Sequence, residues 1–213
     1  MKLFLSLLLS ITLISGLHAD DKFTKAMKKN LSKIDTLKTA ADFIETANNF
    51  ERIALAEKSE WLPYYYASYL YILASYSDPN SENKDSYLDK ADSFSNTADS
   101  LKPDNSEIYT IKGMACQARL QIDPMNRWMK YGQQADSYLR KAMELDTLNP
   151  RPEHLIGMSI YFMPEQFGGG LKAAQPYFDS ASKKYDEFVP ENELSPNWGM
   201  MMFKGFLEQI RKP

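Results

Sequence analysis

Alanine and large apolar residues recur along the chain with the spacing of one helix face. Four segments carry an Ala, an aromatic residue three positions later and a second Ala seven positions after the first: Ala47, Phe50 and Ala54; Ala91, Phe94 and Ala98; Ala135, Tyr138 and Ala142; Ala174, Tyr177 and Ala181. The first Ala recurs at steps of 44, 44 and 39 residues. Positions i, i+3 and i+7 share one side of a helix, where small Ala side chains allow close packing. The pattern predicts stacked helix pairs, because one such helix cannot bury its apolar face alone.

Partner helices are expected between these segments. Their predicted ranges are 61–76, 106–122 and 152–162, and an initial helix is expected over 23–44. The excess length over a compact helix pair falls in three turns within the hairpins, at 77–84, 123–132 and 163–170. We find no convincing period-two alternation of the kind that β-strands produce. The sequence therefore predicts an all-α fold of antiparallel helix hairpins, stacked as a short α-solenoid.

The C-terminal segment has the pattern of a capping helix. Trp198, Met202, Phe206 and Ile210 follow one another at intervals of four, with Phe203 and Leu207 beside them. A terminal helix of this kind closes the open end of a repeat stack. The alternative is a helix that binds a partner or a membrane surface.

The first 19 residues have the parts of a secretory signal peptide. Lys2 precedes an apolar run over 3–14, and Ala19 stands before the polar Asp20-Asp21 pair. The run is shorter than the ~20 residues that span a bilayer, although an uncleaved anchor is the alternative. Cleavage is expected after Ala19, leaving 20–213 as a single domain that is exported to the periplasm or secreted. No second long apolar run exists, so we expect no membrane insertion after cleavage.

Charge and reactive residues exclude several functional classes. Without Lys2, the chain has 24 Lys and Arg against 28 Asp and Glu, a net charge of −4, whereas nucleic-acid binding needs a basic surface. Cys116 is the lone cysteine, expected to be buried, and only His154 remains as a histidine, expected to be partly exposed near a helix start. Metal sites and nucleophilic triads draw on clusters of such residues. We therefore expect no metal, no cofactor and no catalysis.

A glycine run offers a candidate anion site. Gly168, Gly169 and Gly170 precede a helix predicted over 171–185, and backbone N–H groups at such a start can hold an anion. Lys172 follows the run, and Arg151 is placed near it by hypothesis. The Lys-Ser/Thr pair of a phosphate loop is absent. The alternative is that the glycines only allow the chain to turn sharply.

Aromatic residues give the main indication of a binding surface. The helix expected over 61–76 holds seven Tyr and Trp residues, too many for one face. Tyr combines contact area, stiffness and a hydroxyl group, and so is favoured at binding surfaces. Core packing accounts for part of the set. We expect a partner groove to be lined by Tyr64, Tyr65, Tyr69, Trp128 and Tyr131.

The repeats resemble the tetratricopeptide repeat (TPR) family. Tyr109 and Gly113 with Ala135, Leu139 and Ala142 follow the family pattern, as do Gly157 with Ala174, Phe178 and Ala181. The repeats here are longer than the family's 34 residues. The segments 50–54, 60–65 and 167–170 are more narrowly similar to uncharacterised exported TPR-like proteins of Bacteroidetes-type bacteria.

That resemblance implies an interaction scaffold and carries no specific activity. Our leading hypothesis is a non-catalytic adaptor that holds a protein or peptide partner in a concave groove. The alternative is a periplasmic small-ligand-binding helper of a transport system, with a pocket between the glycine loop and the Tyr-rich helix. An open groove would favour the first hypothesis, and a closed apolar cavity would favour the second.

Overall fold

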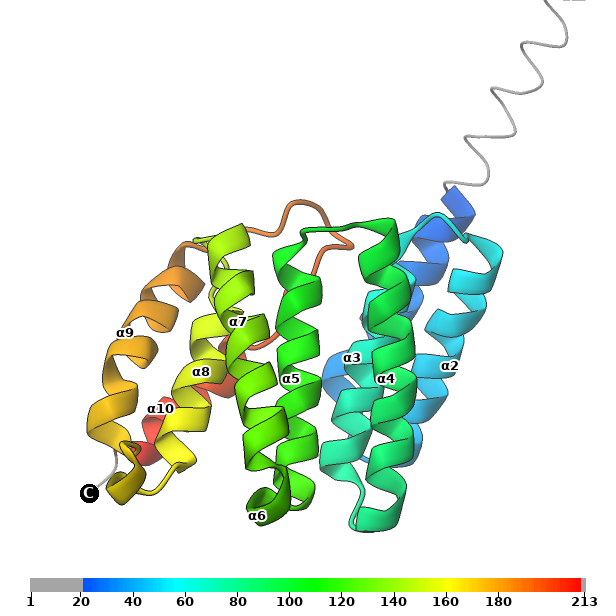
Figure 1. The fold of residues 1–213 in the computed structure, drawn as a ribbon. Helices are drawn as coiled ribbons and strands as arrows, with labels where there is room; N and C mark the ends of the chain where they lie inside the picture. The colour runs from blue at the N-terminus through cyan, green and yellow to red at the C-terminus, as the bar shows by residue number, and fades with distance from the viewer. Residues whose placement is uncertain (1–20, 212–213) are drawn as a thin grey trace, which may run out of the picture.

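The computed structural model describes residues 21–211, and within this range the protein is all-α (Figure 1). The predicted signal peptide lies outside the described residues. Residues 21–31 are helical. The elements that follow are η1 (Ile34–Thr36), α2 (Ala40–Ala56), α3 (Trp61–Ser77), α4 (Ser81–Leu101), α5 (Ser106–Ile122), α6 (Pro124–Arg127), the π-helical turn η2 (Trp128–Gly132), α7 (Gln133–Leu145), α8 (Arg151–Phe162), η3 (Glu165–Phe167), α9 (Leu171–Glu187) and α10 (Met200–Ile210). The prediction of an all-α hairpin stack is confirmed.

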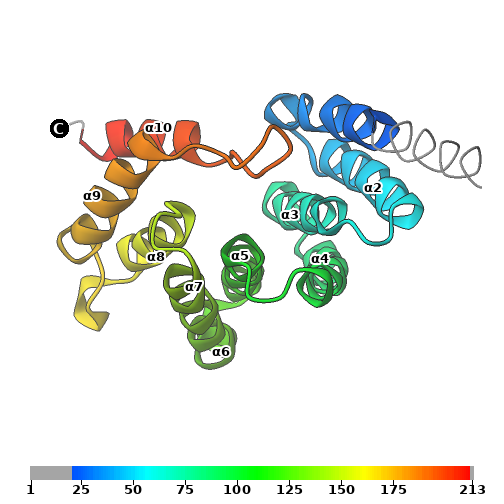
Figure 2. The same cartoon turned by 90° about the horizontal axis from the view of Figure 1, so that it is seen from above.

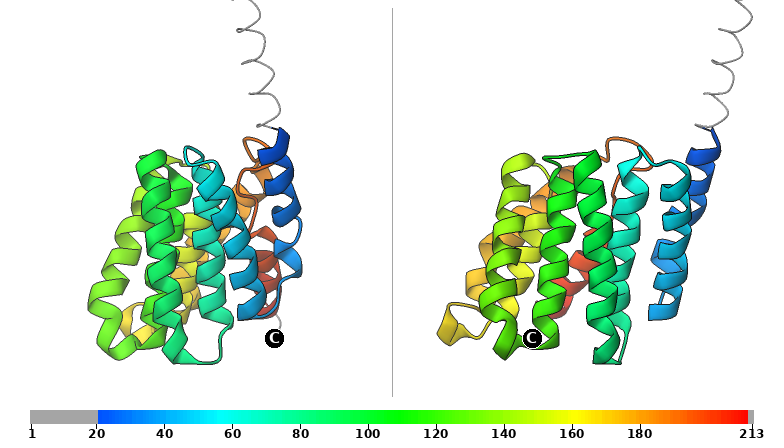
Figure 3. Two further views of the ribbon diagram at one scale, coloured as in Figure 1. Left: turned by 90° about the vertical axis from the view of Figure 1, so that its right-hand side faces the viewer. Right: turned by 45° about the vertical axis from the view of Figure 1, so that its right-hand side comes forward.

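The helices form a curved double layer. Consecutive helices pack side by side in antiparallel pairs, and α3, α5 and α8 also contact one another in that order. These three helices lie on the inner side of the arc, with α4 and α7 outside them (Figure 2). The side views show the hairpins standing roughly parallel in the stack (Figure 3). Turns within hairpins therefore gather at one end of the stack, and turns between hairpins at the other.

The alanine pattern packs as predicted. All eight Ala residues of the four segments are at most 4% exposed. Two glycines of the TPR-like pattern mark closer approaches: a Cβ on Gly113 would lie 2.6 Å from Leu139, and one on Gly157 would lie 2.6 Å from Phe178. In each hairpin a large residue of the second helix fills the space that the missing Cβ leaves on the first.

Three predicted boundaries were wrong. The helix expected over 23–44 is interrupted after residue 31, and α2 begins anew behind Thr39, whose side chain forms a capping box with Asp42. Because this capping box satisfies free backbone N–H groups at the start of α2, a new helix begins there and the first helix does not continue. The turns expected over 77–84 and 123–132 are largely helical, because Asn80 and Asp123 cap the starts of α4 and α6.

The C-terminal segment both crosses and closes the arc. Residues 188–199, here called the strap, run without regular structure from α9 over the inner side and lead into α10 (Figure 2). Lys28 of the first helix pairs with Glu193 of the strap. Helix α10 then caps the last hairpin, with Phe203 and Leu207 buried against it. The predicted capping helix is present, but its buried face centres on these two residues and not on Met202.

Candidate functional site

Two of the tyrosines expected to line a groove, Tyr65 and Tyr69, face the inner side of the stack but are covered by the chain itself. Tyr65 is 0% and Tyr69 3% exposed. The Trp198 ring of the strap stacks on Tyr69 with 4.7 Å between ring centroids, and its Nε1 donates to the Tyr65 hydroxyl at 2.7 Å. The Tyr66 hydroxyl donates to the Leu194 carbonyl at 2.8 Å. In this structure the strap occupies the place of the expected partner.

The other predicted groove residues lie elsewhere. The Tyr64 hydroxyl donates to the Ala54 carbonyl of α2, and its ring lies near Phe94 of α4, so this side chain serves hairpin packing. Trp128 and Tyr131 belong to η2, at the end where turns within hairpins gather. The structure therefore does not bring the five residues into one groove. Within α3, Tyr64 lies on a different face from Tyr65 and Tyr69, and Trp128 and Tyr131 belong to a separate element, η2.

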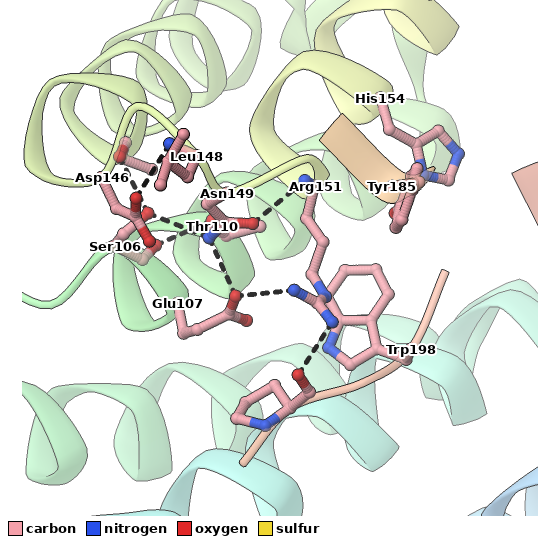
Figure 4. Close-up of polar contacts among 12 residues, drawn as sticks. Ser106, Glu107, Thr110, Asp146, Leu148, Asn149, Arg151, His154, Tyr185 and Trp198 are labelled. Atoms are coloured by element: carbon pink, nitrogen blue, oxygen red, sulfur yellow. Dashed lines mark hydrogen bonds and ion pairs between the residues drawn. The ribbon is translucent and has the colours of Figure 1, made fainter. Parts of the chain in front are cut away.

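A buried polar network lies beneath the strap (Figure 4). Glu107 Oε1 accepts from Arg151 Nη1 at 3.0 Å and from Asn149 Nδ2 at 2.8 Å, and Oε2 accepts from the Tyr65 hydroxyl at 2.8 Å. Burial raises the pKa of the Glu107 carboxyl, and the Arg151 guanidinium is the main influence in the opposite direction. These partners satisfy both carboxylate oxygens of Glu107, which lowers the cost of burying its charge pair with Arg151.

Arg151 ties this network to the strap. Its side chain is completely buried, and Nη2 donates to the Pro196 carbonyl at 2.9 Å. The guanidinium lies over the rings of Phe188 and Trp198, 4.6 and 5.2 Å from their centroids. Arg151 begins α8, whereas the glycine loop follows the end of that helix. The hypothesis that Arg151 lies beside the glycine loop was therefore wrong.

The glycine loop uses its own N–H groups internally. The Gly168, Gly169 and Gly170 N–H groups donate to the carbonyls of Glu165, Pro164 and Ile160. Gly168 and Gly170 have φ of 85° and 88°, and a Cβ on Gly169 would clash with the Met163 carbonyl. These glycines therefore serve the sharp turn, which was the alternative explanation. Lys172 is exposed at the start of α9.

The two residues with reactive side chains are both buried. His154 is 6% exposed, contrary to the expected partial exposure, and its Nδ1 lies 3.1 Å from the Tyr185 hydroxyl. Burial, with a smaller effect of Arg151, lowers the pKa of His154 to about 4. Cys116 is buried as predicted, and burial raises its pKa to about 11. Both side chains are thus neutral core residues at pH 7.

A pocket of about 400 Å³ opens where turns between hairpins meet the strap. Its lining includes four carboxylates and two aromatic rings: Asp104, Glu107, Asp146, Glu191, Trp61 and Phe188. Such a lining disfavours anionic ligands.

A second accessible surface is apolar. Phe162, the last residue of α8, is 69% exposed, and Met202 of α10 is 59% exposed. Tyr161 and Phe206 are half-buried beside Phe162, with the Phe206 centroid 5.1 Å from that of Tyr161 and 6.2 Å from that of Phe162. Met202 and Phe206 share a face of α10, being four residues apart. We call these four residues the α8–α10 surface. Sequence reasoning missed it because Tyr161 and Phe162 stand outside the alanine pattern.

Comparison with solved structures is informative about the family. No family model matches the chain, and no curated protein does. Among solved structures, the chain is similar to the HusA haemophore from Porphyromonas gingivalis, with 30% sequence identity and a TM-score of 0.80. The similarity covers 89% of this chain and 92% of that one. The chain belongs to the HusA haemophore family.

Membership in the HusA family clarifies two predictions. A haemophore is a binding protein, so the prediction of a non-catalytic protein is confirmed. Porphyromonas is a Bacteroidetes genus, in keeping with the narrower resemblance found in the sequence, whereas membership in the TPR family itself is not shown. Within residues 21–211 no helix is long and apolar enough to cross a bilayer.

Proposed function

We propose that this protein is an exported binding protein for haem or a closely related tetrapyrrole. The proposal rests on its membership in the HusA haemophore family over nearly the full length of both chains. It replaces the protein scaffold with the small-ligand alternative. The inner side of α3 supports the change, since the strap already covers the tyrosines expected to hold a protein partner.

We assign the ligand to the α8–α10 surface. A tetrapyrrole presents a broad apolar ring face, and aromatic and thioether side chains bind such faces by stacking and dispersion contacts. Phe162 and Met202 offer exposed contact area, and the half-buried rings of Tyr161 and Phe206 pack beside Phe162. The acid-lined pocket at the other end is a poor alternative, because haem carries two propionate carboxylates that it would repel.

Iron coordination by His or Cys is disfavoured at this surface. His154 is buried against Tyr185, and Cys116 lies within α5. Met202 is the member of the surface with a thioether, and Met can serve as an axial haem ligand. We therefore expect contacts with the tetrapyrrole ring to provide most of the binding affinity, with Met202 as the candidate iron ligand.

Titration with haemin tests the assignment. Phe162→Ser and Met202→Ser should each weaken binding about tenfold or more, equivalent to ~1.4 kcal/mol, as followed by Soret absorbance. Leu148→Ser is the matched control, since Leu148 is 71% exposed in the turn between α7 and α8. If wild-type protein fails to bind haemin, the proposed function is wrong. Unchanged affinity in both surface variants would reject the site alone.

Metal-free protoporphyrin separates the two contributions. Binding within about tenfold of haemin is expected if ring contacts dominate. Met202→Ser should then weaken haemin binding more than porphyrin binding. Equal losses would remove Met202 from the role of iron ligand.

A further inference from the structure

Within residues 21–211, glycine lies inside three α-helices, and in α10 helix packing does not explain it. Gly113 of α5 and Gly157 of α8 leave room for Leu139 and Phe178, each 2.6 Å from the Cβ that an alanine would add. At Gly205 of α10, no atom lies within 4 Å of such a Cβ. Its φ is also negative, as in any helical residue. Because glycine is less favourable inside a helix than any residue except proline, stability does not account for this position.

Gly205 lies at the centre of the solvent-facing side of α10. The buried residues Phe203 and Leu207 are each two positions away, which corresponds to ~200° around the helix axis. Met201 and Met202, four and three positions earlier, share the side of Gly205 and are 80% and 59% exposed. The missing side chain therefore leaves the helix backbone uncovered beside two exposed thioether groups.

This uncovered backbone adjoins the α8–α10 surface. Met202 belongs to that surface, and Phe206, whose ring centroid lies 6.2 Å from that of Phe162, follows Gly205 directly in the chain. Glycine is used where a ligand approaches the backbone closely, because a side chain would hold the ligand away. A flat ring system gains most from such a floor, since many of its atoms reach contact distance together.

We propose that Gly205 is a positioning residue of the ligand site, and that a planar ring lies against the uncovered backbone of α10 in contact with Met201 and Met202. This inference rests on the proposed function and deepens it, because it adds Gly205 and Met201 to the same site. Gly205 acts by leaving space, and it thereby favours flat rings over ligands that are bent or bulky.

Haemin titration of Gly205→Ala and Gly205→Leu tests this role. The added side chains should weaken binding at least about threefold and about tenfold, while the midpoint of urea unfolding stays unchanged or rises. A purely structural residue would not give weaker binding together with equal or better folding. Lys204→Leu is the matched control, since Lys204 is exposed on another side of α10 and forms only a surface ion pair with Asp186. It should leave haemin affinity within about twofold.

Metal-free protoporphyrin should show the same losses in the Gly205 variants as haemin, because the ring and not the iron meets this position. Unchanged or tighter binding by Gly205→Leu, while Phe162→Ser still weakens it, would overturn this inference and leave the proposed function standing. Equal losses in Lys204→Leu, or a lower urea midpoint in Gly205→Ala, would also overturn it. If the wild-type protein does not bind haemin, the proposed function and this inference both fail.

Discussion

At the residue scale, the smallest side chains set the closest helix contacts. Gly113 and Gly157 each face a large residue of the following helix, at distances that exclude a Cβ. His154 shows the reverse case, in which a polar ring is accommodated in the core. Its Nδ1 faces the Tyr185 hydroxyl, and its ring centroid lies 4.6 Å from that of Phe203. Both arrangements make stability sensitive to single atoms.

Gly157→Ala should destabilise the protein by roughly 1–3 kcal/mol, because the added methyl group overpacks the α8–α9 contact. The new Cβ would lie 2.6 Å from two ring carbons of Phe178. Gly205→Ala is the control, since no neighbour lies within 4 Å of a Cβ there. That change should be neutral or stabilising by up to ~1 kcal/mol, as Ala is the better helix former. Urea unfolding measures both, and similar effects would refute the close-contact argument.

Acid should destabilise the fold through His154. Its folded pKa is about 4, below the usual 6.5, so the unfolded chain binds the extra proton between these values. The free energy of unfolding should therefore fall as pH drops from 6.5 to 4, by about 3 kcal/mol from this residue. His154→Asn keeps an acceptor near Tyr185 but cannot titrate. Chemical unfolding of both proteins should show a shallower fall in the variant; parallel curves would contradict the assignment.

At the element scale, the strap closes the arc by linking its two ends. It leaves α9, contacts α3 through Trp198 and Leu194, and reaches the first helix through Glu193. The exposed pair with Lys28 contributes little, as surface ion pairs usually do. The stacked ring of Trp198 and the buried Arg151 bond account for most of the attachment.

Trp198→Ala should lower the free energy of unfolding by roughly 2–4 kcal/mol, since it removes the stacking on Tyr69 and the donor to Tyr65. Trp128→Ala, at a site 58% exposed, is the control and should change stability by less than about 0.5 kcal/mol. Denaturant unfolding measures the difference. If Trp198→Ala behaves like the control, the strap is held by other contacts.

At the scale of the whole molecule, the acid-lined pocket and the α8–α10 surface lie at opposite ends of the stack. The strap fills the inner side where turns between hairpins gather, and the acid-lined pocket opens beside it. The α8–α10 surface lies at the end of α8, where the turns within hairpins gather.

The helix stack could be predicted from the sequence, because its cause is local and periodic. Ala at i and i+7 with an aromatic residue at i+3 defines a helix face wherever it occurs, and all eight Ala residues are buried. Local sequence signals also predicted the observed bounds of α5, Ser106 and Ile122. It also supplied the turn function of Gly168–Gly170 as one of two explanations.

Only the tertiary structure decided which aromatic residues are accessible. Tyr65 and Tyr69 are covered by Trp198, more than 120 positions away along the chain. The helical periodicity of the sequence cannot reveal such a contact. Likewise, Phe162 and Phe206 become neighbours only when α10 folds back onto the last hairpin. Periodicity determines which residues share a face of one helix, whereas the exposure of that face depends on which other segments of the chain pack against it.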